Sequence, residues 1–425
     1  MRVRYDQKRE CLVTNNTSIA DFDLITTKRY AEQGYPHEEW KLMRETKPIH
    51  YFGDSEIPYW AITKHAHITE IGRQPDLFLN APRLVVNPVM AEAEENMAAT
   101  GFTRPKTLIE LDNPMHRVNR KLISSYFTPR ALKKMHGDFD RISRKVVDDF
   151  LLEDGEVDFV EKVSAPLPIA VIAYILGVPE SDWNSIFEWT NQMIGVEDPE
   201  YQNEEGSDKA MTDLFGYFAE MIEDRKKNPK DDLVSILVQS EIDGKKIELL
   251  DLLAWCQIIV VAGNETTRNA TSGGMLALIQ HPHELQRLRE NPELLPSAIE
   301  EFVRWSSPII HFARTAARDV DFHGAKIREG DTLSLFYPSA NRDADVFDDP
   351  DTFRIDRSPN PHVGYGVGEH FCAGAHVARL ELKLAFEYLI PRLEEIEVTG
   401  PISRLHSNLV GGIKHLPVRF KTRKA

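Results

Sequence analysis

Apolar and polar positions along the 425-residue chain recur mostly with the spacing of amphipathic helices. Asn113-Pro114 and Thr128-Pro129 each join a capping residue to a proline, a pair typical of helix starts. A long helix is expected from about residue 249 to 279, where His281-Pro282 ends it and begins another helix. Helices therefore dominate the predicted fold.

Strand-like segments are few and short. Strands are expected at residues 59–62, 331–336 and 418–420. Gly324 and Gly330 bracket an alternating stretch that is typical of a hairpin. Residues 341–361 are rich in Asp, Asn and Pro and predict a loop of unusual length, which suggests either function or disorder.

The most apolar stretch, residues 165–179, is too short to span a bilayer and predicts a buried core helix ending at Gly177. The charged N-terminus lacks the apolar core of a signal peptide. Cys11, Cys256 and Cys372 are spaced too widely for a disulfide framework or a four-cysteine zinc site, which favours a reducing compartment. A net charge of -16 makes nucleic acid a poor partner. We expect a soluble, cytoplasmic chain with no transmembrane segment, and a peripheral membrane contact stays open.

The segment with the clearest chemistry is residues 365–374, YGVGEHFCAG, in which three glycines surround Cys372. Glycines permit tight turns and the close approach of a flat ligand to the backbone. A helix is expected to begin at Cys372, and a helix N-terminus lowers the pKa of a thiol. The resulting thiolate suits a soft metal. The alternative is a buried structural cysteine.

A second unusual segment, AGNETT at residues 262–267, lies within the long predicted helix. Gly263 costs helix stability, and two adjacent threonines add little. A weak point in a buried helix suggests a groove or bulge that faces a ligand. The alternatives are a harmless irregularity or a glutamate that forms a surface pair.

Residues 365–374 resemble the haem-binding loop of the cytochrome P-450 family, F-x-x-G-x-H/R-x-C-x-G, with Tyr365 in place of the phenylalanine. The resemblance implies that the Cys372 thiolate is the fifth ligand to the iron of haem b (iron protoporphyrin IX). It also implies that Tyr365 and Gly366 lie beside the cofactor.

Residues 262–267 resemble the family's A/G-G-x-D/E-T-T motif, in the helix that crosses the distal face of the haem. By this resemblance Ala262 and Gly263 contact the haem. Thr266 would hydrogen-bond iron-bound dioxygen or its water, and Glu265 would relay protons.

Two further sets of residues match the family, although each residue alone fits an ordinary helix surface. The positions implied to hold the haem propionates are His116, Arg120, Arg314 and His370. Glu301 and Arg304 share a helix face, and with Arg357 they match a buried structural triad behind the haem loop.

These motifs occur in the family's order between about residues 110 and 376, so the resemblance covers at least the C-terminal two-thirds of the chain. It implies a mainly α fold with small β-sheets, the triangular prism of the cytochrome P-450 family enclosing haem. Length alone favours two or three domains, but the resemblance implies a single domain over residues 1–425. Residues 85–101 carry no recognisable motif.

The leading hypothesis is a haem-thiolate monooxygenase that inserts one oxygen atom of dioxygen into an unactivated C–H bond. Because the sequence has no flavin or iron–sulfur motif, electrons are expected from a separate ferredoxin and ferredoxin reductase. Basic residues near the expected proximal side either steer an acidic ferredoxin or form a solvated face; they are Arg117, Lys121, Arg130, Lys133, Lys134 and Arg379. A peroxide-driven enzyme is disfavoured by Glu265 and Thr266, and a gas sensor by the lack of an output domain.

The expected pocket is mostly apolar, with Arg83 and His311 as its polar anchors, so an apolar substrate is expected. Its expected lining is residues 78–90, Phe102, and residues 258–262, 309–312 and 409–413. AGNETTRNA, FARTA, SPNPHVGYG and GGIKH resemble bacterial hydroxylases of steroid side chains and methyl-branched lipids. The resemblance implies a sterol side chain or branched lipid; the rivals are a compact terpene and an aromatic acid held by Arg83. A monomer is expected.

Overall fold

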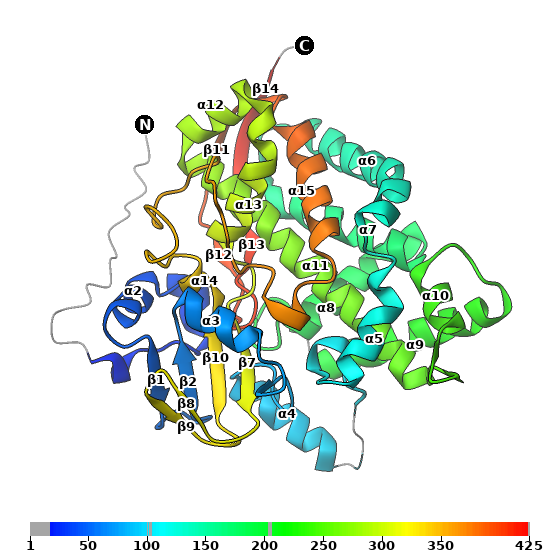
Figure 1. Cartoon of the computed structure of the whole chain (residues 1–425). Coiled ribbons are helices and arrows are strands. Elements are labelled where there is room, and N and C mark those ends of the chain that lie inside the picture. The colour runs from blue at the N-terminus through cyan, green and yellow to red at the C-terminus, as the bar shows by residue number, and fades with distance from the viewer. Residues whose placement is uncertain (1–17, 100, 102–103, 203–205, 424–425) are drawn as a thin grey trace.

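The computed structural model describes residues 18–99, 101, 104–202 and 206–423; Cys11 and Phe102 lie outside this range. Helices form most of the described chain, and the largest sheet lies to one side of them (Figure 1). The mainly α fold with small β-sheets is confirmed.

The α-helices are α1 (Thr27–Gln33), α2 (His37–Thr46), α3 (His65–Gly72), α4 (Pro88–Ala99), α5 (Met115–Ser124), α6 (Pro129–Leu151), α7 (Pro166–Leu176), α8 (Trp183–Ile194), α9 (Gly206–Lys227), α10 (Leu233–Gln239), α11 (Leu249–Gln280), α12 (Pro282–Glu290), α13 (Leu295–Ser306), α14 (Tyr337–Ala340) and α15 (Ala375–Leu389). Short 3₁₀ or π turns are η1 (Ile19–Asp21), η2 (Leu108–Glu110), η3 (Val160–Ser164), η4 (Glu180–Asp182), η5 (Pro292–Leu294) and η6 (Gly368–His370).

The largest sheet has the order β1-β2-β10-β7-β3, and only the β10–β2 pair in it is parallel. Its strands are β1 (Ile49–Phe52), β2 (Tyr59–Ile62), β3 (Phe78–Leu79), β7 (His311–Ala316) and β10 (Thr332–Phe336). A second sheet joins β11 (Leu393–Val398), β14 (Pro417–Thr422) and β4 (Glu156–Asp158). The two-stranded pairs are β5 (Glu241–Ile242) with β6 (Lys245–Lys246), β8 (Val320–Phe322) with β9 (Ala325–Ile327), and β12 (Ser403–Arg404) with β13 (Ile413–His415).

The central helix α11 runs through the middle of the molecule (Figure 1) and packs against α7, α9, α13 and α15. Among the described residues it alone is long and apolar enough to cross a membrane, and this packing accounts for its composition. It continues as an α-helix through Gly263, so the expected bulge is absent. A side chain at Gly263 would lie 2.3 Å from Ile172 of α7, so close helix packing explains this glycine.

Several local predictions hold, with two corrections in detail. The apolar stretch forms α7, which Gly177 ends in the left-handed conformation, and residues 341–361 contain no helix or strand. The Thr128 hydroxyl caps α6 by accepting from the Ala131 N–H at 3.2 Å. Asn113 does not cap α5 as predicted, because its side-chain amide donates to Glu369 at 2.8 Å instead.

The expected hairpin near Gly324 and Gly330 exists, but its position was wrong. Gly324 lies in the turn between β8 and β9, and Gly330 lies in the next turn, before β10. His323 and Gly324 both have positive φ, the conformation that a two-residue hairpin turn requires. The glycine therefore marks the centre of the hairpin and not its edge.

Candidate active site

Cys372 lies between η6 and α15, in a loop that its own N–H closes by donating to the Tyr365 carbonyl at 2.8 Å. Protein surrounds the thiol, yet its residue remains solvent-accessible. Burial raises the pKa of Cys372, and N–H groups of Gly374 and Ala375 oppose that shift only in part. The predicted lowering is therefore wrong for the protein alone: α15 begins at Ala375, and desolvation outweighs the helix N-terminus.

Tyr365 packs under the same loop against a charged pair. The Arg379 guanidinium lies 4.3 Å from the centre of the Tyr365 ring and donates to both oxygens of Glu300, at 2.6 and 2.8 Å. The buried Tyr365 hydroxyl has no hydrogen-bond partner among the described residues. Arg379 is therefore not the free surface cation that the sequence suggested. Arg117 is likewise paired, with Glu369.

A cluster of four cationic or titratable side chains lies beside this loop; we call it the His116 cluster. Its members are His116, Arg120, Arg314 and His370. The rings of His116 and His370 stack with centres 3.8 Å apart, and neither nitrogen of buried His116 has a hydrogen-bond partner in the described structure. Burial, with help from the neighbouring cations, lowers the pKa of His370 to about 3.

No carboxylate forms a salt bridge with any member of the His116 cluster in the described part of the chain. The Arg120 guanidinium donates to the Phe371 carbonyl at 2.7 Å, and buried Arg314 donates to its neighbour Ala313 at 2.7 Å. Buried cations normally have an anionic partner. A flat cofactor with carboxylates at its edge supplies that partner, so this donor set fits a haem with its propionates.

Two residues that the sequence analysis did not identify, Asn80 and Asp112, border this cluster. The Asn80 side-chain nitrogen lies 3.3 Å from Nδ1 of His370 and donates to the Ile109 carbonyl at 2.6 Å. The Asp112 carboxylate accepts the N–H groups of Asn80 and Ala81, at 2.7 and 3.1 Å. These bonds fix residues 80 and 81 beside α5. The position of Asp112 before a helix start was the only signal.

On α11, Ala262 is exposed and Thr266 half-exposed, although the helix is central. The Thr266 hydroxyl donates to the Ala262 carbonyl at 2.8 Å. Glu265 is fully buried, and its Oε1 accepts from Arg268 at 2.7 Å while Oε2 has no partner among the described residues. Burial raises the pKa of Glu265, and Arg268 opposes that shift. The Arg268 pairing was not foreseen, although the i, i+3 spacing allowed it.

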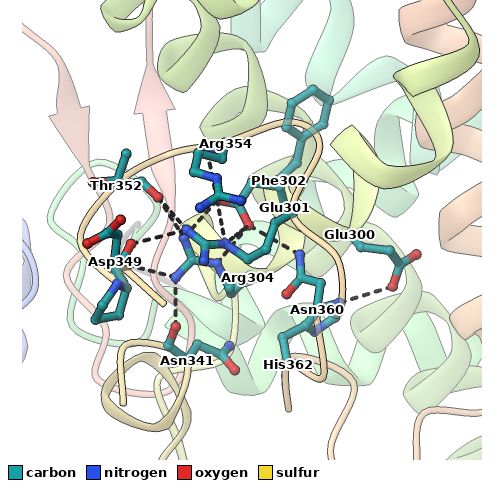
Figure 2. Close-up of polar contacts among 12 residues, drawn as sticks. Glu300, Glu301, Phe302, Arg304, Asn341, Asp349, Thr352, Arg354, Asn360 and His362 are labelled. Carbon is teal, nitrogen blue, oxygen red and sulfur yellow. Dashed lines mark hydrogen bonds and ion pairs between the residues drawn. The ribbon is translucent and has the colours of Figure 1, made fainter. Parts of the chain in front are cut away.

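Glu301, Arg304 and Arg357 meet in a buried cluster, as expected; we call it the Glu301 cluster. Glu301 accepts from Arg304 at 2.7 Å through each oxygen and from Arg357 at 3.1 Å. Its carboxylate also accepts from the Asn360 amide and the Arg354 N–H, and Figure 2 shows these groups around it. The remaining guanidinium N–H groups that are bonded reach backbone carbonyls of the 341–361 loop.

Three of the segments expected to line a pocket lie side by side. Ile309 bridges Val410, and Ala313 donates to the Leu84 carbonyl at 2.6 Å. His311 is not an open substrate anchor: it is fully buried, and Nε2 accepts the Val86 N–H at 3.1 Å. Burial lowers its pKa to about 4. Arg83 is half-exposed and has no hydrogen bond or ion pair within the described chain.

Comparison with known proteins places this geometry in one family. The cytochrome P-450 family model matches residues 71–414. A steroid C26-monooxygenase of Mycolicibacterium smegmatis is 38% identical, over 94% of this chain and 94% of its own. A methyl-branched lipid omega-hydroxylase of Mycobacterium bovis is 35% identical, over 95% of each chain. A Mycobacterium marinum cytochrome P-450 solved with pseudoionone superimposes with a TM-score of 0.85, at 31% identity, over 94% of this chain and 98% of its own.

The extent of these matches agrees with the site. They span nearly the whole chain, and the matched region contains the Cys372 loop, the α11 motif and both buried clusters. The small sheets around a helical body are those of the cytochrome P-450 fold. The chain therefore belongs to the cytochrome P-450 family of haem-thiolate monooxygenases.

Proposed function

We propose that this chain binds haem b through Cys372 and hydroxylates the end of a sterol side chain or a methyl-branched lipid, with electrons from a separate ferredoxin and its reductase. The observation that carries the cofactor assignment is the His116 cluster beside an accessible thiol: among the described residues, Arg120 and buried Arg314 donate only to backbone carbonyls, and buried His116 has no hydrogen-bond partner. Tyr365, Gly366, Ala262 and Gly263 would be among the residues that contact the cofactor.

The haem, when bound, supplies the redox chemistry that splits dioxygen and oxidises the C–H bond. The protein holds Cys372 for ligation, and the N–H groups of Gly374 and Ala375 favour its thiolate. His116, Arg120, Arg314 and His370 would donate to the propionates.

Release of one oxygen atom as water consumes two protons, and α11 offers groups to deliver them. Thr266 exposes part of its surface, and its hydroxyl bonds only to a carbonyl of its own helix among the described residues. It can therefore rotate to donate toward the open side. Glu265, the preceding residue, would supply protons to it through water, because adjacent side chains on a helix point in different directions. We propose these two residues as the relay.

The thiolate assignment is tested by Cys372→Ser. The variant is expected to lose the red-shifted Soret band of the reduced carbonyl complex. Cys256→Ser is the matched control, because Cys256 is buried in α11 and burial raises its pKa far above neutrality. If Cys372→Ser keeps the wild-type band, another residue holds the iron.

The substrate proposal is supported by the apolar segments around Ile309 and Val410 and by the names of the two relatives. Burial of hydrocarbon in such a slot contributes about 25 cal/mol per Å². A smaller terpene is the second candidate, because a Pseudomonas protein named cytochrome P-450-terp is 35% identical over 93% of this chain. An aromatic acid at Arg83 is the third.

A titration panel separates these candidates by the low-to-high-spin shift of the haem. The panel is cholest-4-en-3-one, a methyl-branched fatty acid, a monoterpene and a benzoate. The proposal predicts tight responses to the first two. A response to the monoterpene or benzoate alone would reject the sterol and branched-lipid assignment and leave the monooxygenase assignment intact.

The proposed ferredoxin site is smaller than the sequence suggested, because Arg117 and Arg379 are paired. The other four residues of that basic set are exposed and have no ion pair in the described structure; they are Lys121, Arg130, Lys133 and Lys134, on α5 and α6. Lys133→Glu/Lys134→Glu should slow reduction by ferredoxin most at low salt. Lys326→Glu, on β9, is the control.

Turnover with hydrogen peroxide alone tests the rival mechanism. Product formed at the ferredoxin-supported rate without ferredoxin and reductase would favour a peroxide-driven enzyme. We further propose a cytoplasmic monomer with one domain over residues 1–425, supported by the way α11 connects to most of the fold. Light scattering of the purified chain tests the monomer.

A further inference from the structure

The arginine that pairs with Glu265 is shared among three elements. Arg268 is fully buried on α11, one turn after Glu265. Its Nη1 lies 2.7 Å from Oε1 of Glu265 and 3.0 Å from the side-chain oxygen of Asn191 on α8. Its Nη2 donates to the Tyr201 hydroxyl. Glu265 thus accepts a hydrogen bond from only one of the two terminal nitrogens of Arg268.

Tyr201 belongs to residues 195–202, which follow α8; we call them the 195–202 segment. Acidic residues attach this segment to other parts of the fold. Glu197 accepts from Thr27 and Asn87, both at 2.9 Å. Asp198 accepts from the His406 N–H and from Lys414, also both at 2.9 Å. The position of the Tyr201 hydroxyl is therefore fixed by contacts far from α11.

The two terminal nitrogens of the Arg268 guanidinium donate to different residues, one to Glu265 and the other to Tyr201. An arginine fork can bind both oxygens of a carboxylate at once. Here Nη2 is turned to Tyr201, and Oε2 of Glu265 is left without a partner in the described structure. A buried donor that loses its acceptor is costly, so Nη2 would turn to Oε2 if the Tyr201 hydroxyl were removed.

We propose that Arg268 and Tyr201 are positioning residues for the Glu265 carboxyl: Tyr201 limits the Glu265–Arg268 pairing to one oxygen and leaves Oε2 free to carry the proton that is delivered toward Thr266. This inference rests on the relay role proposed above for Glu265. In each delivery the O–H bond at Oε2 breaks and its proton passes to a water beside Thr266, while the Thr266 hydroxyl gives its own proton onward and takes one from that water, so neither the water nor the hydroxyl keeps a charge. The carboxylate that remains is compensated by Arg268 and takes its next proton from water.

Other charged groups face the pair from neighbouring elements. Asp158 of β4 attracts Arg268, and Lys414 of β13 lies 5.5 Å from the centre of the Tyr201 ring. Neither has a hydrogen bond to Glu265 within the described chain, whereas the Asn269 side chain, on α11 itself, acts with Arg268 to favour the Glu265 carboxylate and so lower its pKa. The Tyr201 hydroxyl is therefore the group whose removal changes the Glu265 pairing with the least change elsewhere.

Tyr201→Phe keeps the ring and removes the hydroxyl. The complete system with ferredoxin, reductase and cholest-4-en-3-one, or whichever panel compound gives the largest spin shift, should show product per NADH lowered about tenfold. An Arg268 that donates to both oxygens of Glu265 lowers the pKa of Glu265. Because the protonated carboxyl is the active form, the alkaline limb of the product-per-NADH profile should shift to lower pH by about one unit. The dissociation constant from the spin shift and the reduced carbonyl spectrum should not change.

Tyr217→Phe is the matched control, because that partly buried hydroxyl donates to Asp182 at 2.8 Å and has no bond to α11. Tyr201→Phe should also have no added effect in a Glu265→Gln background, since coupled residues are non-additive. An equal loss in both backgrounds would overturn the proposal, as would a wild-type pH profile for Tyr201→Phe. If Glu265→Gln alone leaves coupling intact, the relay role itself fails. If Glu265→Gln does not fold, the pH profile of Tyr201→Phe still decides.

Discussion

Two buried charged clusters near the Cys372 loop differ in where their partners come from. In the Glu301 cluster, each carboxylate oxygen accepts several bonds, and Arg304 and Arg357 extend to backbone carbonyls. In the His116 cluster, stacked histidines and two arginines meet without a carboxylate in salt-bridge contact among the described residues. The Glu301 cluster therefore satisfies its own charges, whereas the His116 cluster does not, although His116 and Arg314 are buried in it.

This difference distinguishes a buried charged cluster that stabilises the fold from one that binds a ligand. Buried polar groups in folded proteins are almost always hydrogen-bonded. A cluster that satisfies itself needs nothing more and fixes the loop around it. A cluster left unsatisfied needs a group from outside, which is why the His116 cluster indicates a bound anion and the Glu301 cluster does not. Glu301→Gln and Arg314→Gln test this contrast directly, and two further predictions concern groups outside the clusters.

The largest effect is expected from Glu301→Gln. The change keeps the size of the side chain but leaves two buried guanidinium groups without their counter-charge. It should destabilise the protein by about 3–5 kcal/mol, measured by urea unfolding. Glu300→Gln is the control, because its partner Arg379 is partly exposed. A cost no larger than that of the control would contradict a structural role for the Glu301 cluster.

Thr266→Ala should come next. Loss of the hydroxyl should leave NADH consumption running while product per NADH falls, because a relay group contributes on the order of a hundredfold. Thr271→Ala is matched: its hydroxyl donates to the carbonyl four residues back at the same 2.8 Å, but the residue is fully buried. Unchanged coupling in Thr266→Ala would remove that residue from the mechanism.

The His116 cluster should respond to substitution in the opposite way to the Glu301 cluster. Arg314→Gln should weaken haem binding about tenfold, the value of one hydrogen bond to a charged group. It should not destabilise the haem-free chain, because a buried cation is removed. Haem transfer to apomyoglobin and unfolding of the haem-free chain measure the two effects. A stability loss as large as that of Glu301→Gln would erase the distinction between the clusters.

The smallest effect on stability is expected from a change of pH at the half-exposed contacts that His415 makes with Glu200 and Asp158. Desolvation lowers the pKa of His415, but bonds to Glu200 at 2.7 Å and Asp158 at 2.5 Å outweigh it, so the pKa is raised. The stabilisation is present below the ordinary histidine pKa of about 6.5 and is lost as pH rises through the raised value. An exposed pair contributes about 1 kcal/mol or less. Hydrogen exchange of the 195–202 segment should therefore quicken with pH beyond its intrinsic rate, and His415→Asn should abolish that excess.

Local order was readable from the sequence because short-range spacing determines it. Pro114 and Pro129 indicated where α5 and α6 begin, although only Thr128 caps its helix, and His281-Pro282 indicated where α11 ends. The Glu301–Arg304 pair followed from helical spacing, and motif resemblance supplied Arg357. The order of glycines around Cys372 indicated its loop before any contact was known.

Only the tertiary structure decided which charges are free and which are paired. The partners of Asn113, Arg379 and His311 are Glu369, Glu300 and the Val86 N–H, each distant in sequence. Tyr201 reaches Arg268 across 67 positions. A hydrogen bond depends on a separation of about 3 Å in space, and sequence spacing fixes such distances only within a helix turn or a hairpin. The sequence by itself therefore determined the helices, the Cys372 loop and the family resemblance. Folding selected the partners that, among the described residues, leave the His116 cluster without a salt-bridged carboxylate and Oε2 of Glu265 without a hydrogen bond.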